Sequence, residues 1–313
     1  MAASPALALA PRAGVIAGLL AAFDARAQLA PDMWDDFKRR FVTTDGRVVD
    51  DDGSTHSEGL GTALLASATV ADREGFERVW GFARGLRRDD GLFSWRVQHG
   101  GRVIDANNAT DGDLYIAWAL ARAARRFEEP RHAAEARRIA RAVRSHCVRD
   151  TRHGPLLVPG RFGFDRGNHV VVNPSYWVFP AFAQFATIDP HPLWRAVSAA
   201  ASELLVRARF GRRALTADWI EVESHAVAPW RERPARFGYE AIRVPLFLYW
   251  GRQLAHPLLQ AFTHYAAAPA FPAWVALDSE ERSNDRAPAG FEAIARLARV
   301  LPAITRAQLP RVN

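Results

Sequence analysis

The chain has 313 residues, of which 49% are hydrophobic, and this is enough material to bury one large core. Its single cysteine, Cys147, excludes an internal disulfide and any cysteine cluster that would hold zinc or an iron–sulfur centre. The formal charge is +7, but the arginines alternate with acids along predicted helices, as at 122–129, which argues against a nucleic-acid partner.

The N-terminal segment has the features of a secretory signal peptide. Arg12 precedes an apolar run at 15–23, and Ala-Arg-Ala at 25–27 has the small-x-small pattern of a cleavage site. The apolar run is too short to act as a stable bilayer anchor. We therefore expect a signal peptide at 1–27, a mature domain at 28–313, and a periplasmic or secreted protein without stable membrane insertion. The alternative is an amphipathic helix that stays on the chain.

Hydrophobic periodicity predicts a chain dominated by helices. The predicted helices cover 60–70, 72–86, 111–127, 131–148, 176–186, 192–209, 239–254 and 289–300. In the third of these helices, Leu114, Trp118 and Ala121 recur at three- and four-residue steps and form one apolar face. Strand alternation is not sustained anywhere, although short extended pieces are expected near 101–103 and 219–222. The pattern predicts a single all-α domain of antiparallel helices.

Three carboxylates stand at the starts of predicted helices, namely Glu58, Asp111 and Glu240. Taken singly, each is better explained by helix capping, and Thr55 and Thr110 each have an acid three residues later, as in a capping box. Together they suggest more, because alternating helices that line a barrel would bring these N-termini to the same end. Glycoside hydrolysis needs such a cluster, with one protonated acid at the leaving oxygen and one ionised base that activates water.

Aromatic residues flank these acidic positions. Trp95 precedes the loop before Asp111, Tyr176 begins a predicted helix, and Trp219 follows Asp218 in the sequence. The faces of Trp and Tyr rings stack on the apolar faces of sugars and leave the hydroxyls free for hydrogen bonds. Core packing is the alternative explanation, because most of the ten tryptophans must be buried.

Several runs along the chain resemble the motifs of glycoside hydrolase family 8, and they occur in that family's order. They are Ser-Glu-Gly-Leu-Gly at 57–61, Leu-Phe-Ser-Trp-Arg at 92–96, Asn-Asn-Ala-Thr-Asp-Gly-Asp at 107–113, Asn-Pro-Ser-Tyr at 173–176 and Tyr-Glu-Ala-Ile-Arg-Val-Pro at 239–245. The resemblance runs from about Trp34 to Trp250, and it is strongest to the endoglucanases encoded with bacterial cellulose synthases.

This resemblance implies an (α/α)6 barrel and an inverting hydrolysis that needs no cofactor or metal. It implies that Glu58 is the general acid and that Asp111 binds and helps to distort the sugar at the cleavage point. It also implies that Tyr176 positions the attacking water, that Trp95 is a platform for a glucosyl unit, and that Arg243 steadies the cleft around the base.

The general base departs from the family pattern. Cellulase-type members carry Asp in a Tyr-Asp-Ala-x-Arg run, and this chain has Glu240 at that position. Glu keeps the charge but moves the carboxylate by roughly 1 Å, and misplacement on that scale can cost about a hundredfold in rate. We expect a working enzyme with Glu240 as the base, or with Asp218 recruited in its place. A weakened or inactive relative is the alternative.

The sequence therefore predicts an endo-β-1,4-glucanase, a cellulase that hydrolyses β-glucan and supports bacterial cellulose synthesis and export, with a cellulose synthase complex as a further partner. Asn108, in the signature run, and Trp219 are predicted to bind substrate. Xylan, chitosan or mixed-linkage glucan are the alternative substrates within the family. A non-catalytic glucan-binding partner of a synthase is the alternative of a different class.

Overall fold

The structure is a computed structural model that describes residues 31–98, 101–267 and 271–308, and the side chains of these residues apart from 31 and 300–308. The predicted signal peptide at 1–27 lies outside the described residues. One hydrophobic core extends through the described chain from Trp34 to Ala298. No helix in the described ranges combines the length and the hydrophobicity that crossing a membrane requires.

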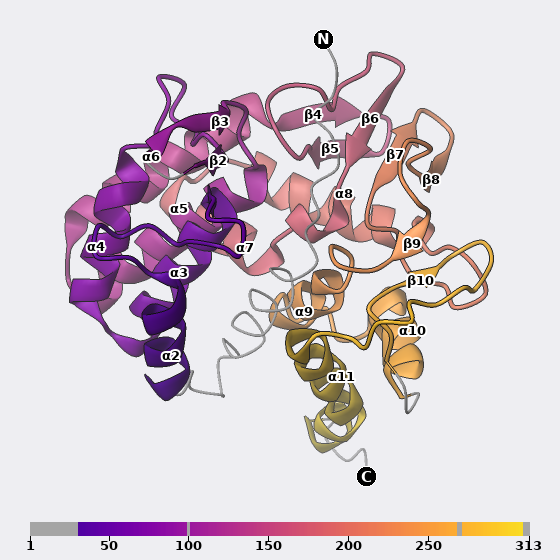
Figure 1. Ribbon diagram of the computed structural model, residues 1–313. Coiled ribbons are helices and arrows are strands. Elements are labelled where there is room, and N and C mark those ends of the chain that lie inside the picture. Colours follow the sequence, from indigo (N-terminus) through magenta and orange to yellow (C-terminus); the bar gives the residue numbers. More distant parts are fainter. Residues whose placement is uncertain (1–30, 99–100, 268–270, 309–313) are drawn as a thin grey trace.

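Ten α-helices make up the frame of the described chain (Figure 1). They are α2 (Pro31–Phe41), α3 (Ser57–Val70), α4 (Arg73–Arg84), α5 (Thr110–Arg126), α6 (Pro130–His146), α7 (Phe179–Ile188), α8 (Leu193–Arg207), α9 (Arg243–Trp250), α10 (Pro257–Ala266) and α11 (Ala289–Gln308). The odd-numbered helices α3, α5, α7, α9 and α11 pack against one another in order, and α4, α6, α8 and α10 pack on their neighbours.

The residue patterns explain which helices form the inner layer. In α5 every residue from Thr110 to Ala121 is buried, including small residues on all sides of the helix. In α6, by contrast, Ile139, Ala140 and Val143 are buried while the arginines lie on the remaining faces. A helix buried all round belongs inside, and an amphipathic helix belongs at the surface. The alternation of the two kinds is the layering of the predicted (α/α)6 barrel.

Two glycines allow α3 and α5 to approach each other closely. A methyl group added at Gly61 would lie 2.5 Å from Cβ of Tyr115 and 3.0 Å from the backbone nitrogen of Ile116. A methyl group added at Gly112 would lie 2.8 Å from the backbone nitrogen of Glu58. Backbone atoms cannot move aside as flexible side chains do, so both positions require glycine to keep the first turns of the two helices together.

We expect the substitution Gly61→Ala to destabilise the protein by about 1–3 kcal/mol, because it overpacks the contact between α3 and α5. The melting temperature should fall by about 2–4 °C for each kcal/mol lost. Gly81→Ala is the matched control, since Gly81 lies within α4 with open space around its Cα; this change should be neutral or stabilising by up to about 1 kcal/mol. Equal melting temperatures for the two variants would contradict the close-contact argument.

Within the described residues, ten short strands form four small sheets between the helices, and β2 to β8 lie along the upper edge of Figure 1. The strands are β1 (Thr55–His56), β2 (Arg96–Val97), β3 (Val103–Asp105), β4 (Val148–Thr151), β5 (Gly154–Leu157), β6 (His169–Val172), β7 (Ile220–Glu223), β8 (Val227–Pro229), β9 (Arg236–Phe237) and β10 (Val275–Ala276). The antiparallel sheets have the orders β1-β2-β3, β4-β5, β6-β7-β8 and β10-β9. Only β3 and β7 lie where the sequence predicted extended pieces.

The structure also corrects the predicted helix boundaries. The helix expected at 176–186 is a short 3-10 turn, η2 (Pro174–Tyr176), followed by α7, which begins at Phe179. The helix expected at 239–254 begins only at Arg243, so the residues before it form a turn. Helices α2 and α10 were not predicted. The other predicted helices are present with ends shifted by at most three residues, except that the helix expected at 289–300 extends to Gln308.

Candidate active site

One side of the site is built by the first turns of α3 and α5, which carry Glu58 and Asp111. The sheet β1-β2-β3 joins the segments that lead into these turns. The N–H of Ser57 donates to the carbonyl of Trp95 at 3.0 Å, and the N–H of Trp95 donates to the carbonyl of Asn107 at 3.0 Å. Three runs that are far apart in the sequence are thereby held in one layer, with the two carboxylates beside each other.

The capping interpretation of these acids is wrong. The N-cap residues are His56 and Ala109, and neither makes a side-chain capping bond. The hydroxyl of Thr110 instead donates to the carbonyl of Val158 at 2.9 Å. Thr55 lies in strand β1, outside the helix. The acids in these first turns are therefore not explained by capping boxes.

The other side of the site is the turn between β9 and α9, which carries Glu240. The sequence predicted that Glu240 would open a helix, whereas it lies three residues before the helix begins. The turn is held from behind by Asp218, whose Oδ1 accepts the N–H groups of Gly238, Glu240 and Ala241. Asp218 is 8% exposed and committed to the backbone, so the structure does not favour its recruitment as the base.

The guanidinium of Arg243 lies between the two sides. Its Nη1 contacts the carboxylate of Glu58 and lies 3.8 Å from Oδ2 of Asp111. Its Nη2 contacts the carboxylate of Glu240 and donates to Oγ of Ser175 at 3.0 Å. The Arg243 side chain is 3% exposed, while those of Glu58 and Glu240 are 15% and 12% exposed. The acids therefore share one buried cation and keep an edge open to solvent.

Burial dominates the electrostatics of this centre. It raises the pKa of Glu240 to about 8 and that of Asp111 to about 7, and the charges of neighbouring acids add to both shifts. Burial also lowers the pKa of Arg243 to about 9, so its guanidinium stays charged at neutral pH. Three carboxylates facing one guanidinium in a buried place cannot all be ionised without strong repulsion. Near neutral pH the centre therefore retains a proton.

Two polar residues at Glu240 were quoted in the sequence motifs but not predicted as part of the site. The side-chain amide of Asn173 donates to Oε2 of Glu240 at 3.1 Å. Oγ of Ser175 lies 3.3 Å from the same oxygen. Both residues belong to the Asn-Pro-Ser-Tyr run, and both are fully buried. The signal was thus present in the run itself, since short polar side chains next to a proline turn are well placed to orient a neighbouring carboxylate.

Of the aromatic residues predicted to bind substrate, Tyr176 lies in this centre and Trp219 lies next to Tyr176. The hydroxyl of Tyr176 hydrogen-bonds to Asp111, which places Tyr176 inside the centre. The ring of Trp219 lies 6.5 Å from that of Tyr176 and is stacked on Phe164 at 6.0 Å. Trp95 and Trp219 are both partly exposed. Each therefore keeps ring surface that a sugar could contact. Phe164, which stacks on Trp219, was not predicted as part of the site.

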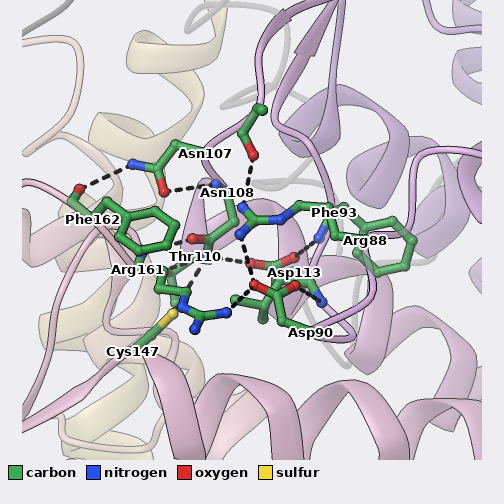
Figure 2. A network of polar contacts seen from close by, with 12 residues as sticks. Arg88, Asp90, Phe93, Asn107, Asn108, Thr110, Asp113, Cys147, Arg161 and Phe162 are labelled. Carbon is green, nitrogen blue, oxygen red and sulfur yellow. Dashed lines mark hydrogen bonds and ion pairs between the residues drawn. The ribbon is translucent and has the colours of Figure 1, made fainter.

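Asn108 lies in a buried network rather than at an open surface (Figure 2). Its Nδ2 donates to Oδ2 of Asp113 at 2.7 Å, and its Oδ1 accepts the N–H of Arg161 at 2.7 Å. Asp113 also accepts the N–H of Phe93 at 2.9 Å, and burial raises its pKa to about 7. Because Asn108 is 3% exposed and its amide is already bonded, its contacts do not support the prediction that it binds sugar directly. These contacts show that Asn108 supports the first turn of α5 through its bond to Asp113.

Sequence comparisons point to one family. The profile described as "Glycosyl hydrolases family 8" matches residues 9–299. A probable endoglucanase of Novacetimonas hansenii is 38% identical over 294 residues, which cover 89% of this chain and 86% of that protein. An endoglucanase of Cellulomonas uda is 34% identical over 228 residues, which cover 71% of this chain and 64% of that protein.

Solved structures agree with the sequence comparisons. The endo-β-1,4-glucanase CMCax of Acetobacter xylinum superposes with a TM-score of 0.80 at 32% identity, covering 92% of this chain and 98% of that chain. The endoglucanase Cel10 of Klebsiella pneumoniae, a family 8 glycosyl hydrolase, superposes with a TM-score of 0.82 at 30% identity, covering 90% and 92% of the two chains. These similarities confirm the (α/α)6 barrel expected from the sequence.

Proposed function

Because the chain belongs to glycosyl hydrolase family 8, we propose that it is an endo-β-1,4-glucanase that hydrolyses β-glucan with inversion of configuration. The observation that carries the proposal is the meeting of Glu58, Asp111 and Glu240 around Arg243. An inverting glycosidase uses two carboxyl groups on opposite faces of the sugar, with room for a water molecule between the base and the anomeric carbon.

In the proposed reaction, Glu58 gives its proton to the glycosidic oxygen as the bond to the anomeric carbon breaks. Glu240 takes a proton from a water molecule, whose oxygen forms the new bond to the anomeric carbon from the opposite face. Since Glu58 contacts Arg243, this contact must loosen when the glycosidic oxygen takes its place.

The remaining site residues take positioning roles in the proposal. The hydrogen bond between Tyr176 and Asp111 supports a role for this pair in holding the reacting sugar and the water. The partly exposed rings of Trp95 and Trp219 support stacking on glucosyl units to either side. Arg243 keeps the carboxylates apart and limits their repulsion. For Asn108 we propose support of Asp113 instead of sugar contact.

The proposed setting is the periplasm or the exterior of the cell, where the enzyme would trim glucan strands made by a cellulose synthase. The N-terminal sequence pattern at 1–27 and the resemblance to endoglucanases encoded with such synthases support this setting. Release of the protein into the periplasmic fraction, with cleavage after residue 27 found by mass spectrometry, is the expected result. An intact N-terminus on the cellular protein would contradict it.

The test of the activity is the release of reducing ends from soluble carboxymethylcellulose, compared with xylan and chitosan at equal mass. We expect release from carboxymethylcellulose first, and NMR should show the α-anomer as the initial product of cleaving the β-linkage. Initial β-anomer would contradict inversion. Binding of the glucan without any release would support the non-catalytic alternative.

The pH dependence follows from the burial of Glu240. A base works only when ionised, so activity rises as the pH rises through the pKa of that base. Because burial raises the pKa of Glu240 from 4.5 to about 8, we expect the low-pH limb of kcat/KM to lie near neutral or mildly alkaline pH. Initial rates on carboxymethylcellulose between pH 4 and pH 10 measure this limb. Full activity at pH 5 would contradict it.

A further inference from the structure

The turn that carries Glu240 depends on one acceptor. The N–H groups of Gly238, Glu240 and Ala241 donate to Oδ1 of Asp218 at 2.9, 3.2 and 2.8 Å. These groups precede α9 and lie in the protein interior, where N–H groups without an acceptor are strongly unfavourable. The conformation of the turn, and therefore the direction in which the Glu240 side chain leaves it, is tied to the position of this one oxygen.

Asp218 is itself fixed by two sheets. Its own N–H donates to the carbonyl of Arg236 in β9 at 2.9 Å. It stands two residues before Ile220, the first residue of β7, which pairs with Val172 at the end of β6. Strand β6 leads directly to Asn173, whose amide donates to the proposed base. One sheet therefore carries both the support of the turn and a partner of the carboxylate.

The packing leaves little space around this arrangement. A methyl group added at Gly238 would lie 3.0 Å from Oδ2 of Asp218 and 3.1 Å from Cβ of Trp274. The glycine thus allows the carboxylate of Asp218 to approach the backbone closely.

Asp218 also acts on Glu240 by charge. Its negative charge, together with that of Asp111, makes ionisation of Glu240 less favourable, while Arg236 partly offsets the charge of Asp218. The titratable and charged groups that face Glu240 are Arg243 from α9, Asp111 and Tyr115 from α5, Tyr176 from η2, Asp218 from before β7, and Glu58 across the guanidinium from α3.

We propose that Asp218 is a positioning residue for Glu240, which fixes the turn beneath it and sets the charge behind it. This inference rests on the proposed function, in which Glu240 is the general base. It differs from the expectation that Asp218 replaces Glu240 as the base, because here Asp218 touches neither water nor sugar and acts through Glu240.

Two variants separate the hold on the turn from the charge. Asp218→Asn keeps an oxygen that can accept the three N–H bonds but removes the charge; it should stay active, with the low-pH limb of kcat/KM moved to lower pH. Asp218→Ala removes both the accepting oxygen and the charge. Its kcat should fall about a hundredfold, the loss typical of a displacement near 1 Å. A crystal structure of this variant should show the turn at 238–241 displaced.

Asp189→Asn is the matched control, because Asp189 is also a buried aspartate, 3% exposed, that accepts bonds from arginines away from the site. It should lower the melting temperature without moving the pH limb. An unmoved pH limb in Asp218→Asn, or an undisplaced turn in Asp218→Ala, would overturn the inference. If Asp218→Ala does not fold, the Asp218→Asn profile decides.

Two further results have separate meanings. Loss of all activity in Asp218→Asn, with the turn in place, would make Asp218 a catalytic residue and overturn the positioning role. If the unmodified protein releases no reducing ends, the proposed function fails. The positioning role is then decided by two measurements, the crystal structure of Asp218→Ala and the pKa of Glu240 followed by carboxyl ¹³C NMR. The pKa of Glu240 should be lower in Asp218→Asn than in the unmodified protein. A purely structural role of Asp218 would leave that pKa unchanged.

Discussion

Replacing Glu58 with glutamine is expected to lower kcat on carboxymethylcellulose by about 10²–10⁴-fold, the range for a lost general acid. Glutamine has nearly the size of glutamate and can stay beside Arg243, but its amide cannot give a proton to the glycosidic oxygen. The fold should survive, because the first turn of α3 is held by its contact with α5 and not by the Glu58 carboxylate. Titration calorimetry with a soluble cello-oligosaccharide should show that binding is retained.

The leaving group provides the sharper test of Glu58. An aryl cellobioside with an acidic phenol as leaving group needs little protonation, so Glu58→Gln should lose far less activity on it than on carboxymethylcellulose. Glu74→Gln is a suitable control, because Glu74 lies in the first turn of α4 with its side chain 85% exposed. Turnover of carboxymethylcellulose by Glu58→Gln at the rate of this control would refute the assignment of the acid.

Replacing Glu240 with alanine is expected to lower kcat by a similar factor, about 10²–10⁴-fold, because water would then lack its base. Glu240→Asp keeps a carboxylate at the position where cellulase-type members carry Asp, so this variant should retain activity or exceed the unmodified protein. The order of activity among the three proteins, measured as reducing ends released at the pH optimum of each, tests the assignment.

A small anion distinguishes the loss of a base from general damage to the site. In Glu240→Ala, azide can enter the space left by the side chain and attack the anomeric carbon without giving up a proton. The carbon–oxygen bond to the leaving group breaks, Glu58 protonates that oxygen, and the product is a glycosyl azide of inverted configuration. No azide product, together with unchanged activity in Glu240→Ala, would show that the base lies elsewhere.

The positions of two prolines would have corrected the helix boundaries that we predicted wrongly from hydrophobic periodicity. Pro180 is the second residue of α7, and Pro245 is the third residue of α9. Proline fits the first turn of a helix, where its missing N–H needs no partner, and it is unfavourable further along. Each proline therefore places the start of its helix within the two or three residues before it. This rule would have put Glu240 in a turn from the sequence alone.

The small sheets had no comparable signal. Strands β6 and β7 have four residues each, too few for a clear alternation, and about fifty residues separate them in the chain. Their pairing is a long-range contact that local periodicity does not contain. The motifs led to Glu58, Asp111, Glu240 and Arg243. The contact of Arg243 with Glu58 and the hold of Asp218 on the turn were not predicted, because they join residues that are far apart in the sequence.

The acid and the base are anchored by separate parts of the fold, the acid by the glycine contact between α3 and α5 and the base by a turn hung on two sheets. This separation has an evolutionary consequence. A different acidic residue at 240 can therefore alter the base without disturbing the register of the helix pair, provided that Asp218 and Arg243 are kept. In directed evolution, the turn that carries the base is therefore the part of the site to vary, and the helix pair that carries the acid is the part to keep unchanged.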